Sequence, residues 1–123
     1  MTRLFLILVV LMLGVFGVGF LVAPSRFAAL VGLRMDTTTA ISDVRAVYGG
    51  FEIGMAVLLI WCMLDPARMR LALGVTAVMF GAVAASRMVG MLLDKPVTSM
   101  TWKIAAVEAV TALIAVVLVW RES

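Results

Sequence analysis

The sequence predicts an all-α integral membrane protein, a four-helix bundle with a short interfacial helix between its first and second spans. Hydrophobic residues make up 65% of the 123 residues and charged residues only 14%, and the mean hydropathy is +1.22. Soluble globular domains are far more polar than this. Each crossing of a hydrocarbon core takes about 20 apolar residues, so the chain has room for four spans and little else. We therefore expect a single transmembrane domain over residues 1–123.

Short polar breaks divide the chain into four apolar segments. The expected spans are residues 4–22, 43–64, 71–93 and 100–119, each approximate at its ends. The first segment is longer than the apolar region of a typical signal peptide and is soon followed by Pro24, so we interpret it as a helix that stays in the protein. Ser42 or Asp43 is the expected N-cap of the second span.

The segment between the first two spans, residues 24–35, combines apolar and basic side chains. Phe27 and Leu30 are apolar at helical spacing, whereas Arg26 and Arg34 can reach outward. This pattern is typical of a short helix that lies on the membrane surface. A plain loop with some apolar residues is the alternative.

Charged side chains inside the expected spans mark the candidate site. At 1.5 Å per residue, Glu52 and Glu108 lie roughly 12–14 Å in from the same side, and Arg87 lies roughly 10 Å in. On scales measured from helix insertion, a charged side chain at the bilayer centre costs roughly 2.5–3.5 kcal/mol. Opposite charges at similar depth should therefore pair. We predict that Arg87 bridges Glu52 and Glu108, with Arg45 at the mouth of the site and Tyr48 hydrogen-bonded beside it.

Glycines on the other helix faces suggest where helices pack. Gly50 and Gly54 form a small-xxx-small pattern, and Gly74 and Gly81 share a stripe of the third span away from its arginine. Gly49 borders the polar face. We expect Gly50, Gly54, Gly74 and Gly81 to form packing surfaces, either within the chain or between chains.

Residue usage excludes several classes of function. With no histidine and one cysteine, the usual zinc sites, bis-histidine haem and an internal disulfide are excluded, so we expect no metal and no cofactor. The ten lysines and arginines are scattered rather than clustered, which argues against a nucleic-acid partner.

A family resemblance rests on three features of the chain. They are the block Arg45-x-x-Tyr48-Gly49-Gly50-x-Glu52, the pair Ser86-Arg87 followed by Asp94 and Pro96, and Glu108 midway along the last span. Together they resemble the bacterial membrane family labelled domain of unknown function 4345, which is similar to the DoxX-like group of four-helix membrane proteins. The resemblance covers nearly the whole chain. One departure is the turn Asp94-Lys95-Pro96, which is a residue shorter than the Asp-Gly-x-Pro of such proteins and lacks its glycine.

The resemblance implies the fold, the choice of residues and a bacterial cell membrane, but it implies no activity. Some DoxX-like proteins are associated with quinone-linked sulfur oxidation, and the lack of redox residues here argues against direct electron transfer. The basic turn at residues 68–70 favours both termini on the cytoplasmic side.

Three functions fit these observations. The polar residues of the candidate site would bind or pass a small polar or amphipathic ligand, such as a lipid headgroup, a quinone-like molecule or a carboxylate. Alternatively, the protein is a structural or accessory subunit whose charges fix helix register and whose glycine faces dock a membrane partner or a second copy. The least favoured reading is an intramembrane isomerase that uses Glu52 or Glu108 as an acid or base.

Overall fold

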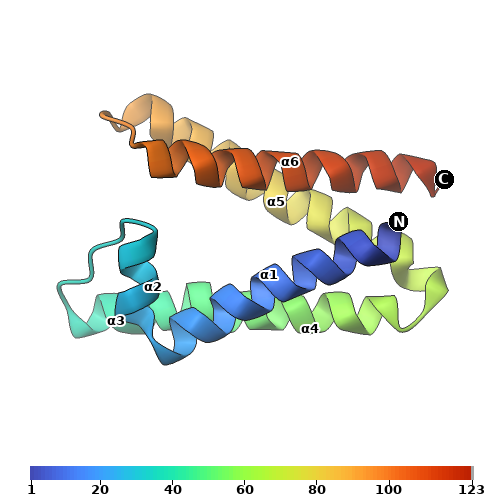
Figure 1. Ribbon diagram of the computed structural model, residues 1–123, viewed down its shortest axis with the longest axis horizontal. Helices are drawn as coiled ribbons and strands as arrows, with labels where there is room; N and C mark the ends of the chain where they lie inside the picture. The colour runs from blue at the N-terminus through green and yellow to red at the C-terminus, as the bar shows by residue number, and fades with distance from the viewer. Residues whose placement is uncertain (123) are drawn as a thin grey trace. The chain divides into compact units, whose positions relative to one another are not determined.

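The structure, a computed structural model, describes residues 1–122, and in that part of the chain every regular element is helical. In chain order the elements are α1 (Thr2–Val22), α2 (Pro24–Leu30), α3 (Thr38–Val44), the π-helical η1 (Arg45–Phe51), α4 (Glu52–Met63), the 3-10 turn η2 (Pro66–Arg68), α5 (Met69–Leu93) and α6 (Ser99–Arg121) (Figure 1). The predicted all-α fold is confirmed. Four helical stretches are long and apolar enough to cross a membrane: Thr2–Val22, Thr38–Met63, Pro66–Leu93 and Ser99–Arg121.

The helices form two compact units. The N-terminal unit runs from Met1 to Pro66, and the C-terminal unit begins at Ala67. The first contains α1 to α4, and the second contains α5 and α6. The single domain expected over the whole chain therefore stays a prediction, and each unit is described by itself.

In the N-terminal unit α1 packs along η1 and α4. Its buried residues recur every three or four positions and so define one face: Leu6, Val9, Leu13, Gly17 and Phe20. The backbones come close at Gly17, where an added Cβ would lie 3.1 Å from both the Gly49 carbonyl oxygen and the Ile53 nitrogen. Small residues permit such close approach between helices in lipid.

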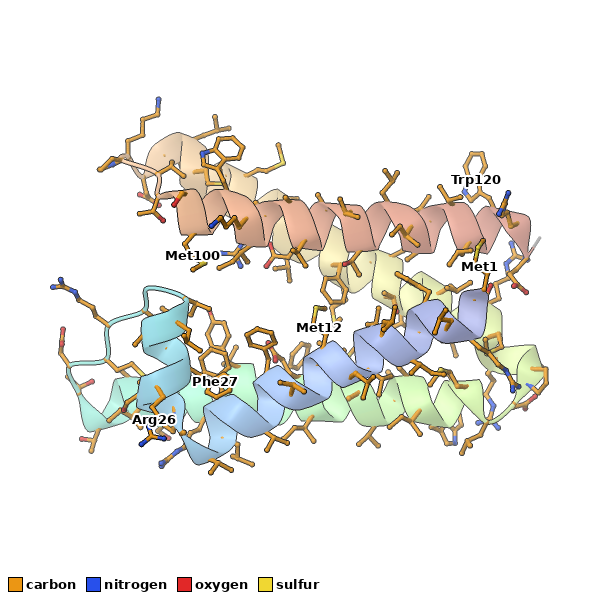
Figure 2. The ribbon with its side chains drawn as sticks, viewed as in Figure 1. Met1, Met12, Arg26, Phe27, Met100 and Trp120 are labelled. Carbon is orange, nitrogen blue, oxygen red and sulfur yellow. The ribbon has the colours of Figure 1, made fainter. Side chains whose placement is uncertain are left out.

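The short helix α2 folds back on the end of α1. Pro24 occupies its first turn, where a missing N–H costs nothing. The Phe27 ring meets Phe16 and Phe20 edge-on, at centroid distances of 6.1 and 5.6 Å (Figure 2). Gly19 leaves room for that ring, because an added Cβ would overlap it. The predicted short helix is thus present, and its place on the membrane surface stays a prediction.

Two boundaries in this region differ from expectation. The short helix ends at Leu30 rather than continuing to residue 35, and Gly32 turns the chain with a φ of +76°. The second span begins at Thr38, and its N-cap is Thr37, whose hydroxyl accepts a 3.1 Å hydrogen bond from the Ala40 N–H. The N-cap expected at Ser42 or Asp43 is wrong, because the earlier threonine already satisfies the first free N–H groups.

In the C-terminal unit α5 packs along α6 (Figure 1). The buried residues of α5 include Leu73, Thr76, Phe80, Ala84 and Met91, and those of α6 are Ala105, Glu108, Thr111, Ala115 and Leu118. Both buried hydroxyls are satisfied locally. Thr76 donates to the Ala72 carbonyl at 2.8 Å, and Thr111 donates to the Val107 carbonyl at 2.7 Å. Glu108 is therefore the buried carboxylate of an otherwise apolar seam.

Candidate functional site

The centre of the candidate site is an ion pair between α5 and α6. Arg87 Nε donates to Glu108 Oε2 at 2.7 Å, and Arg87 Nη2 donates to Glu108 Oε1 at 2.6 Å. Two parallel N–H···O bonds of this kind are the strong, directional form of an arginine–carboxylate pair. The Glu108 side chain is 11% exposed and that of Arg87 is 30% exposed. The carboxylate is therefore enclosed, while part of the guanidinium reaches the surface.

The spacing of buried residues along α5 and α6 places Arg87 and Glu108 where the two helices meet. Arg87 follows the buried Ala84 by one turn on α5, and Glu108 lies between the buried Ala105 and Thr111 on α6. Small alanines beside the charged groups let the two helices approach closely enough for direct hydrogen bonds. The pairing of Arg87 with Glu108 that the charge pattern predicts is present in the structure.

A hollow opens beside the ion pair, where α5 ends and α6 begins. Its volume is about 300 Å³, and its lining residues are Arg87, Gly90, Met91, Asp94, Pro96, Val97 and Thr101. We call it the α5–α6 pocket. Most of its lining is apolar, and the polar contributions come from Arg87, Asp94 and Thr101. Since the apolar spans end at Leu93 and restart at Ser99, the pocket lies at one end of two spans.

Asp94 lines the pocket but is not among the predicted site residues, although it lies on the same stripe of the third span as Arg87. Its side chain is exposed, and its carboxylate makes no hydrogen bond or ion pair within residues 1–122. Thr101 is different, since its hydroxyl lies 3.0 Å from that of Thr98. Spacing could have indicated Asp94: it follows Arg87 by seven residues and Met91 by three, so all three share one helix face.

A second hollow adjoins the same arginine further along α5. Its volume is about 390 Å³, and Ala82, Val83 and Ser86 line it together with Arg87. Ala82, Val83 and Ser86 are exposed. Arg87 therefore forms part of the wall of two hollows in the C-terminal unit.

The other predicted site residues lie in the N-terminal unit. Arg45 is exposed and begins η1. Tyr48, expected to hydrogen-bond beside Arg45, packs its ring on Phe20 at a centroid distance of 5.2 Å and is 38% exposed. Glu52 begins α4, and its buried Oε2 has no hydrogen-bond partner among the described residues. The expected bridge from Arg87 to Glu52 joins residues of different units and stays a prediction.

The π-helical conformation of η1 changes the faces expected in this stretch. A π-helix closes i→i+5 hydrogen bonds, so its turn is wider than the 3.6 residues assumed for an α-helix. Gly49 is buried, and a Cβ there would lie 3.2 Å from the Leu21 nitrogen. Gly50 is exposed, and a Cβ there would meet only the Arg45 carbonyl oxygen at 3.9 Å. Gly49, which was expected to border the polar face, is therefore the glycine that contacts α1.

Three of the predicted packing glycines have open space at the position of a Cβ. A Cβ added at Gly54, Gly74 or Gly81 would meet no other atom within 4 Å. Their expected role as packing surfaces, either within the chain or between chains, stays a prediction. No group of three or more His, Cys, Asp or Glu side chains gathers as metal ligands would within residues 1–122.

Comparison with known proteins identifies the family. No curated protein and no solved structure matches the chain. One family model matches residues 1–119, which include both the N-terminal polar stretch and the ion pair of α5 and α6. The protein therefore belongs to the family described as a domain of unknown function (DUF4345).

Proposed function

We propose that the protein is a membrane-embedded binding module that takes a small amphipathic ligand in the α5–α6 pocket. The observation that carries the proposal is a hollow of about 300 Å³ whose wall combines a fixed arginine with apolar side chains. Ligand pockets in proteins have volumes of roughly 300–1,000 Å³ and are mostly apolar, with a few polar groups that fix orientation. The α5–α6 pocket is at the lower end of that range, which suits a headgroup rather than a whole lipid.

The ion pair supports binding because it fixes the arginine before any ligand arrives. Two hydrogen bonds to Glu108 hold the plane of the Arg87 guanidinium, so a ligand would not have to order that side chain. The surface next to the pocket suits an apolar tail. Leu92 and Leu93, at the end of α5, are 74% and 77% exposed. An amphiphile could place its polar end in the pocket and its tail along these side chains.

A pocket-filling variant tests the proposal. A Cβ at Gly90 would meet only Asp94 Oδ2, at 3.9 Å, so Gly90→Ala fits without rearrangement, whereas Gly90→Leu places a branched side chain in the pocket. We expect native mass spectrometry from a mild nonionic detergent to detect a co-purified amphiphile on the wild-type protein and on Gly90→Ala, but not on Gly90→Leu. Gly74→Leu is the matched control on α5, since Gly74 does not line the pocket and has open space around its Cβ position. An adduct that survives on Gly90→Leu, or none on the wild type, would contradict the proposal.

A structural or accessory role is the second candidate, and it is favoured by different observations. Glu108 accepts two N–H groups of Arg87, as a pair that only fixes helix register would, and Gly54 has open space where a partner helix could dock. This role predicts that Gly54→Leu changes the copy number seen in the same mass spectra while Gly90→Leu does not. An acid/base enzyme has less support, because both carboxylate oxygens of Glu108 are held by arginine.

A further inference from the structure

The charges around the α5–α6 pocket indicate what kind of headgroup it can hold. One positive group, Arg87, and one negative group, Asp94, line the pocket directly. A second negative group, Glu108, is bonded to Arg87 and does not line the pocket. The three groups together carry a net charge of −1, and Lys95, although adjacent in sequence, does not line the pocket.

The positive group is already compensated, whereas the lining carboxylate is not. Arg87 directs Nε and Nη2 at Glu108, so an anion approaching Arg87 would compete with a carboxylate held at 2.6 and 2.7 Å. The Asp94 carboxylate has no hydrogen-bond or ion-pair partner within residues 1–122. An ionised carboxylate can only accept hydrogen bonds, so the group that complements it must donate them.

We propose, building on the proposed function, that the α5–α6 pocket selects an amphiphile with an ammonium headgroup, and that Asp94 is the residue that determines this specificity. An ammonium group supplies three N–H donors and the charge that balances the pocket. One N–H can be donated to the Asp94 carboxylate and another to the Thr101 hydroxyl oxygen, which also lines the pocket. The apolar Met91, Pro96 and Val97 then surround the first carbons of the chain. A carboxylate ligand is one of the classes that the sequence suggested. The net negative charge of Arg87, Asp94 and Glu108 together disfavours it.

The experiment uses amphiphiles that differ only in the headgroup. Dodecylamine and dodecanoate share a tail and carry opposite charges, and each is titrated against the purified protein in a nonionic detergent while native mass spectrometry reports bound adducts. We expect dodecylamine to bind and dodecanoate not to bind. Asp94→Asn keeps the shape of the side chain and removes its charge, and we expect it to bind dodecylamine about tenfold or more weakly, since hydrogen bonds to charged groups are the stronger class. Asp36→Asn is the matched control, because it removes the same charge from an exposed position outside the pocket.

Two further probes identify the source of the ammonium group. Lysophosphatidylethanolamine carries it on a lipid headgroup, and lysophosphatidylglycerol with the same tail lacks it. Binding of the first and not the second would assign a membrane lipid, whereas binding of dodecylamine alone would assign a free amine. Dodecanoate binding as tightly as dodecylamine, or dodecylamine binding that is unchanged in Asp94→Asn, would overturn the selectivity.

The experiment distinguishes a wrong ammonium selectivity from a wrong assignment of the pocket. If Gly90→Leu abolishes dodecylamine binding while Asp94→Asn leaves it intact, the pocket stands and the ammonium selectivity is lost. If Gly90→Leu leaves dodecylamine binding intact, the pocket assignment is lost, and the proposed function fails with it. Thermal unfolding of each variant in the same detergent shows whether it retains the wild-type fold.

Discussion

At the scale of single residues, the geometry of the Arg87–Glu108 pair decides which substitutions it can tolerate. The contact runs along the Nε side of the guanidinium, and each nitrogen meets its own carboxylate oxygen. A lysine offers a point charge on a flexible stem and cannot reproduce this fork. The pair thus depends on arginine in particular and not on positive charge alone.

A double-mutant cycle on this pair measures its contribution to stability. Arg87→Ala leaves Glu108 enclosed without its partner, and Glu108→Ala does the same to Arg87. Losing one partner of a fully buried pair costs roughly 3–5 kcal/mol, and since Arg87 is 30% exposed we expect about 2–3 kcal/mol for each variant. In the double variant Arg87→Ala/Glu108→Ala we expect a loss smaller than the sum of the two single losses, because neither charge is left enclosed without its partner. Unfolding in mixed detergent micelles is the measurement, and strictly additive losses would show that the two residues are not coupled.

The sequence predicted this pair but not the polar group beside it. Arg87 and Glu108 stand out because each is an isolated charge deep in an apolar span, and such a charge needs a partner whatever the details of the fold. Asp94 stands two residues before Pro96 in a turn, where an aspartate is ordinary. Helical spacing places Asp94 on the face of Arg87, but it does not show that the chain between α5 and α6 surrounds a hollow there.

At the scale of elements, η1 is where sequence reasoning was least accurate. The stretch Arg45–Phe51 is π-helical, so side-chain directions inferred at 3.6 residues per turn do not hold across it. Two adjacent glycines, Gly49 and Gly50, lower the helical preference there without specifying which hydrogen-bond pattern replaces it. Periodicity therefore located the span, but could not identify the glycine that contacts α1.

Alanine substitutions of glycine test which positions hold α1 against the second span. Gly17→Ala would place a Cβ 3.1 Å from two backbone atoms of η1 and α4, and backbone cannot move aside as a side chain can. We expect a loss of about 1–3 kcal/mol, the usual cost of overpacking. Gly54→Ala is the control, since its Cβ meets nothing within 4 Å, and it should be neutral or slightly stabilising. Equal thermal stabilities of the two variants in detergent would contradict the assigned contact.

At the scale of the whole molecule, the number of spans was predicted well because it depends on composition and length alone. The expected spans end within a few residues of the helices, and the main differences are the earlier starts at Thr38 rather than residue 43 and at Pro66 rather than residue 71. Residues 38–43, which are mostly polar, occupy the first turns of the second span rather than a preceding loop. Hydropathy underestimates such a helix, because its polar first turns can remain outside the apolar layer.

Four spans place both chain ends on the same side of the membrane, and the basic turn at residues 68–70 favours the cytoplasmic side. Cys62, the single cysteine, is buried and can be replaced first to give a background without thiols. On that background we expect Thr37→Cys and Lys95→Cys to react with a membrane-impermeant maleimide in intact cells, and Ala67→Cys to react only after lysis. The reverse labelling pattern would invert the orientation, and labelling of all three in intact cells would contradict four spans.

Arg87 and Glu108 lie on consecutive helices, and this order has a consequence for the insertion of the protein into the membrane. The two residues belong to consecutive helices joined by the short segment 94–98, so they can meet as soon as the second of these helices has been synthesised. Until then, the guanidinium of Arg87 lies within an apolar span without the carboxylate of Glu108 to balance its charge. Delivery of α5 and α6 as one hairpin avoids that state, because the pair crosses the lipid boundary with no net charge. We therefore expect stable insertion of α5 to depend on the synthesis of α6.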